Sequence, residues 1–216
     1  MRNFKKTLSF LLSTVIIVSS VVGVGTTVFA ATDEHTYKNF KYRILDDNTA
    51  EICGYTGKNA VVTVPDSIDL KPVTSIGRTA FYSGKIKEVT IPNTVRSIKW
   101  WAFYGCESLE KINLNFGLKT VGYGAFMNCK NLKSVSIPMS VTQICDDSFA
   151  VSCSTKKGVF DTYSKQTIST QQYSTDSSFT LDGYSGTVAE KYCNDNSLNF
   201  VSSGNVIYGD VNNNGT

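Results

Sequence analysis

The sequence predicts a repeat solenoid that is mainly β, with a β-hairpin capping its N-terminal end and a short helix capping its C-terminal end. Three observations support this fold class. Similar residues recur at a nearly constant spacing through the middle of the chain. Short Val-x-Ile segments, some of them followed by proline, are typical of strands. No stretch keeps a 3.6-residue hydrophobic period for three turns, which argues against a helical bundle.

The repeat is clearest in four segments that align with one another. They begin with Val73-Thr-Ser-Ile76, Val95-Arg-Ser-Ile98, Leu118-Lys-Thr-Val121 and Val141-Thr-Gln-Ile144. The aromatic residues that match between the segments are Phe81, Phe103, Phe126 and Phe149, whose numbers show the spacing of the repeat. A single unit cannot bury its apolar face alone, so stacking is expected to turn each recurring position into a ladder within one core.

The strands of these units are expected at Val89-x-Ile91, Ile112-x-Leu114 and Val135-x-Ile137. Because side chains alternate along a strand, the middle residues should point outward. These residues are Thr90, Asn113 and Ser136. The phenylalanine of each unit should fill the space between the two sides of the coil, where full burial contributes about 2 kcal/mol.

The units follow the pattern I-G-x-x-A-F-x-x-C-x-x-L-x-x-V-x-I-P, which resembles the BspA-like leucine-rich repeat. The family's cysteine and leucine positions are occupied by Cys106, Cys129, Leu109 and Leu132. The sequence departs from the pattern at Ser83-Gly84 and at Asn115-Phe116, where proline is usual, and the fourth unit decays after Cys153. The resemblance extends over about residues 40–201, and the solenoid with its caps is expected at residues 31–201.

Both ends of the repeat region also fit a capped solenoid. Phe40–Ile44 and Ala50–Cys53 predict a hairpin around a polar turn at residues 46–48, similar to the usual N-terminal cap of the family. Thr187-Val-Ala-Glu190 matches a capping box and predicts a short helix. Its residues expected to cover the last coil are Val188, Ala189 and Tyr192. The Ser- and Thr-rich segment Ser154–Ser178 is interpreted as an irregular last coil or a surface loop.

The N-terminal segment, residues 1–30, is predicted to be a signal peptide. A basic start at Met1–Lys6 precedes an apolar run at Leu8–Val24. Val28-Phe-Ala30 then places small residues where a signal peptidase cleaves, so Ala31 is the expected N-terminus of the secreted protein. A membrane anchor is the alternative, because the run is nearly long enough to span a bilayer. The expected location is extracellular or at the surface of a bacterial cell.

The charge of the chain restricts the classes of partner. Arg2, Lys5 and Lys6 account for the whole formal charge of +3, so residues 31–216 hold equal numbers of basic and acidic residues. This balance predicts neither a nucleic acid nor a membrane as a partner after cleavage of the signal peptide.

The six cysteines leave two interpretations open. An even number in an exported protein suggests disulfides. Cys106 and Cys129, however, stand at the same position of two successive repeat units. A cysteine that recurs in this way is commonly a small buried hydrophobic residue.

Catalytic constellations are scarce, and the prediction is that the protein is not an enzyme. His35 is the only histidine, and it lies in a polar leader before the first expected strand, so a His-assisted nucleophile has one remote candidate base. The sequence contains no C-x-x-C pair for zinc and no phosphate-binding glycine loop. Asp46-Asp47 and Asp146-Asp147 keep a carbohydrate-active enzyme as a weaker alternative, although aspartate pairs are common in turns.

A surface for recognition remains, and the family resemblance implies adhesion or ligand binding at the cell exterior. In one column of the repeat stand Arg78, Trp100, Tyr123 and Asp146. Exposed aromatic residues on a regular face can stack on sugars or anchor a protein partner. The candidate ligand-binding residues are Trp100, Trp101, Tyr104, Tyr82, Tyr123 and Asn113. The alternative that these side chains only cover the flank of the solenoid stays open.

The last residues suggest a second module. After a linker at residues 202–208, residues 209–216 resemble the opening of a type I dockerin, a paired calcium-loop module that binds cohesins. The expected ligands at loop positions 1, 3, 5 and 7 are Asp210, Asn212, Asn214 and the carbonyl of Thr216. The ligand at position 12 and the second loop are missing, so tight binding of Ca²⁺ or cohesin is not expected, and no other cofactor is predicted. A complete dockerin would make the chain an accessory component of a cellulosome-type polysaccharide-degrading complex; a Gly/Asn-rich tail is the plain alternative.

Overall fold

The computed structural model describes residues 34–149, 152–161, 166–174 and 178–205, with backbone alone for 152–174 and for residue 205. The proposed signal peptide and the dockerin-like tail therefore lie outside the described residues. The strands of the N-terminal half are β1 His35–Tyr37, β2 Phe40–Ile44, β3 Ala50–Tyr55, β4 Val61–Thr63, β5 Ser67–Ile68, β6 Lys71–Ile76, β7 Glu88–Thr90 and β8 Ser97–Ile98. They are followed by β9 Lys111–Asn113, β10 Thr120–Val121, β11 Ser134–Ser136, β12 Gln143–Ile144, β13 Ser152–Asp161, β14 Gln166–Ser174, β15 Thr180–Ser185, helix α1 Val188–Asn196 and β16 Asn199–Asn205.

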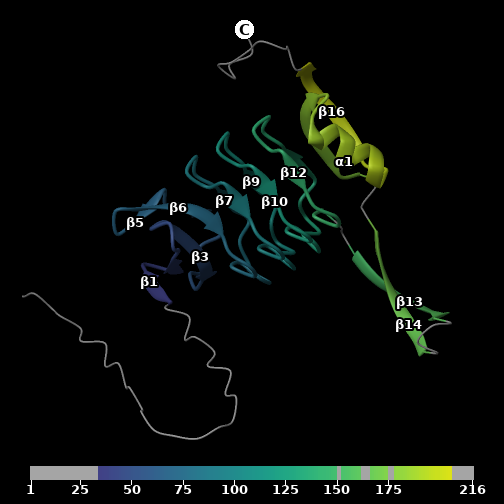
Figure 1. Ribbon diagram of the computed structural model, residues 1–216, viewed down its shortest axis with the longest axis horizontal. Helices are drawn as coiled ribbons and strands as arrows, with labels where there is room; N and C mark the ends of the chain where they lie inside the picture. Colours follow the sequence, from purple (N-terminus) through teal and green to yellow (C-terminus); the bar gives the residue numbers. More distant parts are fainter. Residues whose placement is uncertain (1–33, 150–151, 162–165, 175–177, 206–216) are drawn as a thin grey trace, which may run out of the picture. The chain divides into compact units, whose positions relative to one another are not determined.

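The mainly β solenoid that the repeat predicts is confirmed. One side of the coil is a sheet of order β1-β2-β3-β6-β8-β10-β12, in which the pairs β3–β6, β6–β8, β8–β10 and β10–β12 are parallel. The short strand β5 pairs with β6 in the antiparallel direction. The other side carries the parallel sheets β4-β7-β9 and β11-β15-β16. Figure 1 shows β7, β9, β10 and β12 within these successive coils. We call the first of these sheets the main sheet.

The strand registers explain the nearly constant spacing of the sequence repeat. In the main sheet Ile76 lies opposite Ile98, and Ile98 lies opposite Val121. Each of these side chains is buried, because like stacks on like from one coil to the next. On the other side of the coil the middle residues of the strands point outward, as predicted, but Thr90 and Asn113 are only half-exposed.

An aromatic ladder fills the space between the two sides of the coil, as predicted. The ring centroids of Phe81 and Phe103 are 4.8 Å apart, and those of Phe103, Phe126 and Phe149 follow at 5.2 Å, all with nearly parallel planes. The ladder is longer than the repeat indicates: Tyr55 extends it at one end and Phe179 at the other.

The cysteines of the repeat are buried thiols, and none of the five described cysteines forms a disulfide. Cys106 donates through its Sγ to the carbonyl of Phe81 at 2.9 Å, and Cys129 donates to the carbonyl of Phe103 at 3.2 Å. Burial raises the pKa of the Cys106 thiol to about 12. These thiols therefore act as small core residues with a weak hydrogen bond, which is the second of the two interpretations.

The decay of the repeat after Cys153 has a structural cause. An antiparallel hairpin of β13 and β14 begins at Ser152 and occupies much of the segment Ser154–Ser178, which we expected to be an irregular last coil or a surface loop. Lacking proline and containing many threonines, the segment is well suited to strands. The coil resumes at Phe179, and β15, which begins at Thr180, pairs in parallel with β11, which begins at Ser134. The hairpin is thus an insertion of about one repeat length.

The N-terminal cap is confirmed with one addition. Strands β2 and β3 form the predicted hairpin, and β1 adds a third strand to it. His35 therefore lies in β1, with its ring centroid 5.3 Å from that of Tyr42, and its assignment to a polar leader before the first strand was wrong. Polar residues alternate with apolar ones too briefly there for the sequence to reveal a strand.

The C-terminal helix is confirmed, but its predicted capping box is wrong. Ala189 and Tyr192 are buried and Val188 is half-buried, as expected for a helix that covers the last coil. The hydroxyl of Thr187 donates to the carbonyl of Tyr184 at 2.6 Å in place of capping the helix, and the carboxylate of Glu190 accepts from the N–H of Gly186. No helix within the described residues is long and apolar enough to cross a membrane.

Candidate functional site

The turns that lead out of the main sheet have a backbone shape that recurs in every coil. Two residues before each ladder phenylalanine the chain adopts a positive φ, at Thr79, Trp101, Gly124 and Asp147. Two residues after the phenylalanine it does so again, at Ser83, Gly105 and Asn128. These tight turns hold the neighbouring side chains at one edge of the solenoid. We call Tyr82, Trp100, Trp101, Tyr104 and Tyr123 the aromatic edge.

Trp101 is the most constrained member of the aromatic edge. Its φ of 55° costs a bulky residue about 1–2 kcal/mol. The guanidinium carbon of Arg78 lies 4.8 Å from its ring centroid, and Tyr123 meets the indole edge-on at 6.3 Å. The indole lies over Gly124 of the next coil, where a side chain would collide with it. The left-handed backbone at Trp101 belongs to the turn that recurs in every coil, so what distinguishes this residue is an indole held in place by Arg78 and Tyr123.

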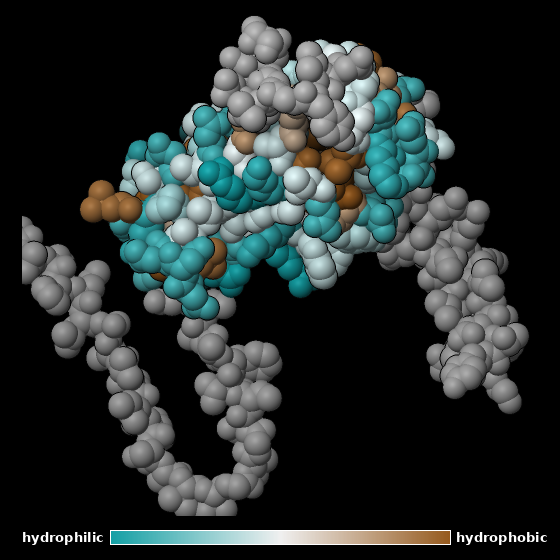
Figure 2. All heavy atoms as spheres, turned by 45° about the horizontal axis from the view of Figure 1, so that its top comes forward, coloured by the Kyte–Doolittle hydropathy of each residue, from teal (hydrophilic) through white to brown (hydrophobic). Residues whose placement is uncertain are grey.

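Trp100 and Tyr82 provide the exposed area of the edge. Trp100 is 59% exposed and Tyr82 is 56% exposed. The rings of Tyr82 and Tyr104 stack at 5.3 Å with an interplanar angle of 7°, and Asn128 donates to the hydroxyl of Tyr104 at 3.1 Å. Figure 2 shows a surface that is mostly hydrophilic on the side presented, with small hydrophobic patches, so exposed apolar area is limited there.

Asn113 does not belong to this site. It lies on β9, in the sheet opposite the main sheet, and its Nδ2 donates to Glu88 at 2.9 Å and to Thr90 at 3.2 Å. Outward-pointing residues occur in the strands of both sheets. The sequence pattern therefore could not show on which face of the solenoid Asn113 lies. The structure thus brings five of the six candidate ligand-binding residues to one edge and leaves Asn113 apart.

The main sheet contains a buried carboxylate that the sequence analysis missed. Glu51 is 1% exposed and joins the cap to the first two coils. It pairs with Arg43 at 2.5 Å and with Lys99, and it accepts a hydrogen bond from Ser75 at 2.6 Å. Burial alone would raise the pKa of Glu51, but the hydrogen bonds from Lys99 and Ser75 and the charges of Lys99 and Arg43 hold it below its usual value.

The two aspartate pairs do not form one carboxylate site. Asp47 lies in the turn between β2 and β3 and accepts hydrogen bonds from Thr49, which lower its pKa. Asp147 lies in the turn after β12, where burial raises the pKa of its carboxyl. Four strand spacings separate β3 from β12, roughly 19 Å, which is wider than the carboxylate separations of glycosidases. Asp47 therefore has the local turn role that aspartates commonly have, whereas Asp147 forms a hydrogen bond with Tyr123 of the neighbouring coil.

No metal site is found in the part of the chain that the structure describes, where no three His, Cys, Asp or Glu residues gather. The proposed calcium ligands lie outside the described residues and stay a prediction. They are Asp210, Asn212, Asn214 and Thr216.

The placement of Trp101 leads to a test of the edge itself. Gly124→Ala is expected to cost about 1–2 kcal/mol for the left-handed backbone and to displace the indole, because the added Cβ would lie 2.7 Å from Cδ1 of Trp101. Gly186→Ala is the matched control, with φ +82° and no heavy atom within 4 Å of the added Cβ. Tryptophan fluorescence should change in the first variant alone; an unchanged spectrum would place the indole elsewhere.

Comparison with known proteins identifies the repeat. The model of the BspA type leucine rich repeat region matches residues 63–180 in six copies. A leucine-rich repeat protein of Bacteroides capillosus is 31% identical, over 52% of this chain and 88% of that chain, with a TM-score of 0.50. A leucine-rich repeat protein of T. pallidum is 30% identical, over 54% of this chain and 66% of that chain, with a TM-score of 0.46. A leucine rich cell surface protein of Faecalibacterium prausnitzii is 26% identical, over 71% of this chain and 46% of that chain, with a TM-score of 0.47. No curated protein matches the chain.

Proposed function

Because the chain belongs to the family of BspA-type leucine-rich-repeat proteins, we propose that it is a non-catalytic recognition module that binds a protein or glycan partner at the exterior of a bacterial cell. Proteins built from leucine-rich repeats are generally not enzymes, and their repeat surfaces bind other molecules. The aromatic edge is the observation that carries the proposal for this chain.

The aromatic edge has the properties of a binding anchor. Six large hydrophobic residues of the described chain are strongly exposed, and Tyr82 and Trp100 are two of them. The neighbouring Trp101 is held in place by Arg78, Tyr123 and a strained backbone, so little side-chain entropy is lost when a partner binds. Rigid aromatic side chains of this kind dominate the energy of many interfaces.

A binding screen tests the proposal. The full chain is presented to neutral plant polysaccharides and to matrix proteins, and each ligand found is measured again with Trp100→Ala. Retention is expected to fall about tenfold or more, the effect of losing an interface anchor, while the thermal midpoint moves little. Phe116→Ala is the matched control, since Phe116 is also 59% exposed but lies outside the aromatic edge. Failure of every class to bind, or turnover of a glycan, would contradict a non-catalytic recognition module.

The location proposed for the protein gives a separate prediction. Expressed in a secreting bacterium, the protein should appear outside the membrane with Ala31 as its first residue, because Val28-Phe-Ala30 forms the expected cleavage site. N-terminal sequencing of the exported material checks this. A membrane-bound product that still begins with Met1 would support the anchor instead.

A further inference from the structure

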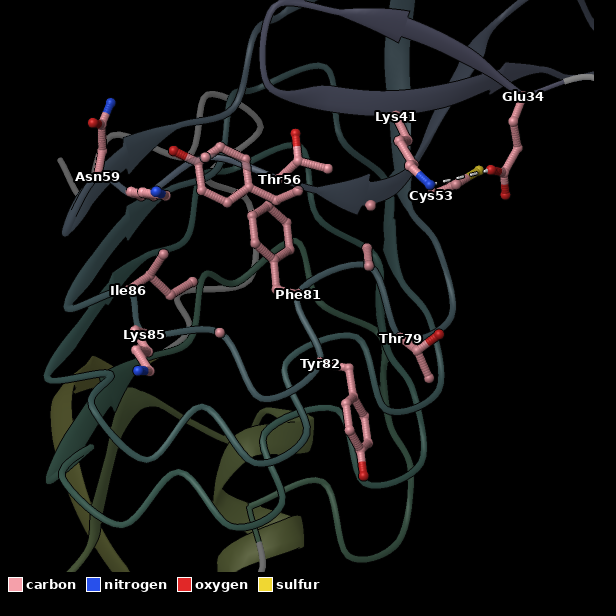
Figure 3. A pocket seen from close by; sticks show the side chains of 16 residues that line it. Glu34, Lys41, Cys53, Thr56, Asn59, Thr79, Phe81, Tyr82, Lys85 and Ile86 are labelled. Atoms are coloured by element: carbon pink, nitrogen blue, oxygen red, sulfur yellow. Dashed lines mark ion pairs between the residues drawn. The ribbon is translucent and has the colours of Figure 1, made fainter.

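A cavity of about 330 Å³ lies where the N-terminal cap meets the first coil. The cap contributes Lys41 from β2, Tyr55 from β3 and the loop at residues 56–59, and the first coil contributes the turn at residues 79–86. Figure 3 shows Phe81 near the centre, with Lys85 and Asn59 on one side and Lys41 with Glu34 on the other. The volume is near the lower end for small-ligand sites, roughly 300–1,000 Å³.

The cavity carries a local excess of positive charge in a chain that is otherwise balanced. Lys41, Lys58 and Lys85 line it, against the single carboxylate of Glu34. Lys41 is 4.0 Å from Glu34, whereas Lys58 and Lys85 form no ion pair within the described residues. A ligand with a negative group would find both lysines available.

The cavity also offers a flat aromatic surface. Tyr104 covers one face of the Tyr82 ring, and Tyr82 lines the cavity as the free end of this stack. The exposed Thr79 adds a hydroxyl to the lining of the cavity. A shallower hollow lined by Tyr104 and Asn128 adjoins the cavity through Gly84 and Lys85, so the surface continues along the stacked rings.

We infer that this cavity binds a uronate-bearing stretch of an acidic polysaccharide. The inference rests on the proposed recognition function and names the class of its ligand. A pyranose ring has an apolar face that stacks on the free face of Tyr82. Carboxylates along the stretch pair with Lys58 and Lys85, and its hydroxyls bond to Thr56, Asn59 and Thr79. The adjoining hollow receives the next part of the chain.

An acidic peptide is the less suitable occupant of the same charges. An aspartate or glutamate side chain supplies the carboxylate but no broad apolar face for Tyr82, and it leaves the polar groups of Thr56, Asn59 and Thr79 without ring hydroxyls to bond. The sugar uses all three features of the cavity, namely charge, aromatic face and hydroxyl-bonding groups.

Calorimetry of the full chain with an oligogalacturonate tests the inference. Its methyl ester, which has the same rings without charge, should bind at least about tenfold more weakly, and binding of the acid should weaken with added salt. The double variant Lys58→Gln with Lys85→Gln, and separately Tyr82→Ala, should each weaken binding of the acid about tenfold, a change of about 1.4 kcal/mol. The matched control is Lys111→Gln with Lys119→Gln, which removes the same charge from two exposed lysines outside the cavity.

Three results would overturn the inference. The first is equal binding of the acid and its methyl ester, and the second is unchanged binding by the cavity variants with unchanged thermal midpoints. The third is displacement of the oligogalacturonate by polyglutamate at comparable concentration, which would assign the site to acidic peptides. If a neutral glycan or a protein binds at the aromatic edge and the oligogalacturonate does not bind, the inference fails while the proposed function stands.

Discussion

Replacing Phe103 or Phe126 by alanine is expected to lower the free energy of unfolding by about 3–5 kcal/mol. Both side chains are at most 2% exposed, and each ring stacks on a neighbour above and below in the aromatic ladder. Removal of one ring loses the free energy of burying it and leaves a cavity between coils. The coils cannot move independently to close this cavity. Urea unfolding followed by circular dichroism measures the loss.

Phe116→Ala is the matched control for this prediction. The chemical change is the same, but Phe116 is 59% exposed, so its replacement should change stability by no more than about 0.5 kcal/mol. Equal losses at Phe103 and Phe116 would show that the ladder is not the core of the solenoid. Asn113→Ala, although outward, should cost about 0.5–1.5 kcal/mol because two hydrogen bonds are lost.

Glu51→Ala is the second change with a large expected effect, a loss of about 1–3 kcal/mol. The buried carboxylate joins Arg43 of the cap to Ser75 and Lys99 of the first two coils, and its removal leaves the buried hydroxyl of Ser75 and two partly exposed cations without their partner. Glu110→Ala is the control: Glu110 pairs with Lys87 at 3.0 Å in an exposed position, where an ion pair contributes about 0–1 kcal/mol. A loss at Glu51 as small as that at Glu110 would contradict a structural role for the network.

The same network predicts a dependence of stability on pH. The folded pKa of Glu51 lies below its unfolded value, so its contribution is complete above the unfolded pKa, about 4.3. The contribution is lost as the pH falls through the folded pKa. The difference in unfolding free energy between the parent chain and Glu51→Gln should therefore be largest near neutral pH and should shrink in acid. A difference that is constant with pH would mean that the charge of Glu51 contributes nothing.

The repeat made most of the fold predictable from the sequence. Because Phe81, Phe103, Phe126 and Phe149 recur at nearly equal spacing, each column had to become a ladder, and the structure confirms it. The fold could not be predicted where the spacing breaks. Phe179 completes the ladder, but the β13–β14 hairpin displaces it from its column, so no period points to it.

The candidate site was predictable in part, for the same reason. Trp100, Tyr123, Tyr82 and Tyr104 emerged because they align between units. The strain at Trp101 could also have been found, since the next unit has glycine in that column and glycine favours a positive φ. The cavity could not have been predicted from the sequence, because Lys58 and its neighbours belong to a cap that does not repeat. The role of Glu51 could not have been predicted either, because its partners come from three separate strands and turns.

The central claim is that recognition occurs at the aromatic edge, and the two tryptophans make one measurement decisive. Trp100 and Trp101 are the only tryptophans in the sequence, so an ¹H–¹⁵N spectrum of the labelled chain contains two indole N–H signals, which Trp100→Ala assigns. A partner identified in the binding screen is titrated into the labelled protein. We predict that the signal of at least one indole shifts or broadens in step with binding. Saturation of the chain with its partner while both indole signals stay unmoved would contradict the claim.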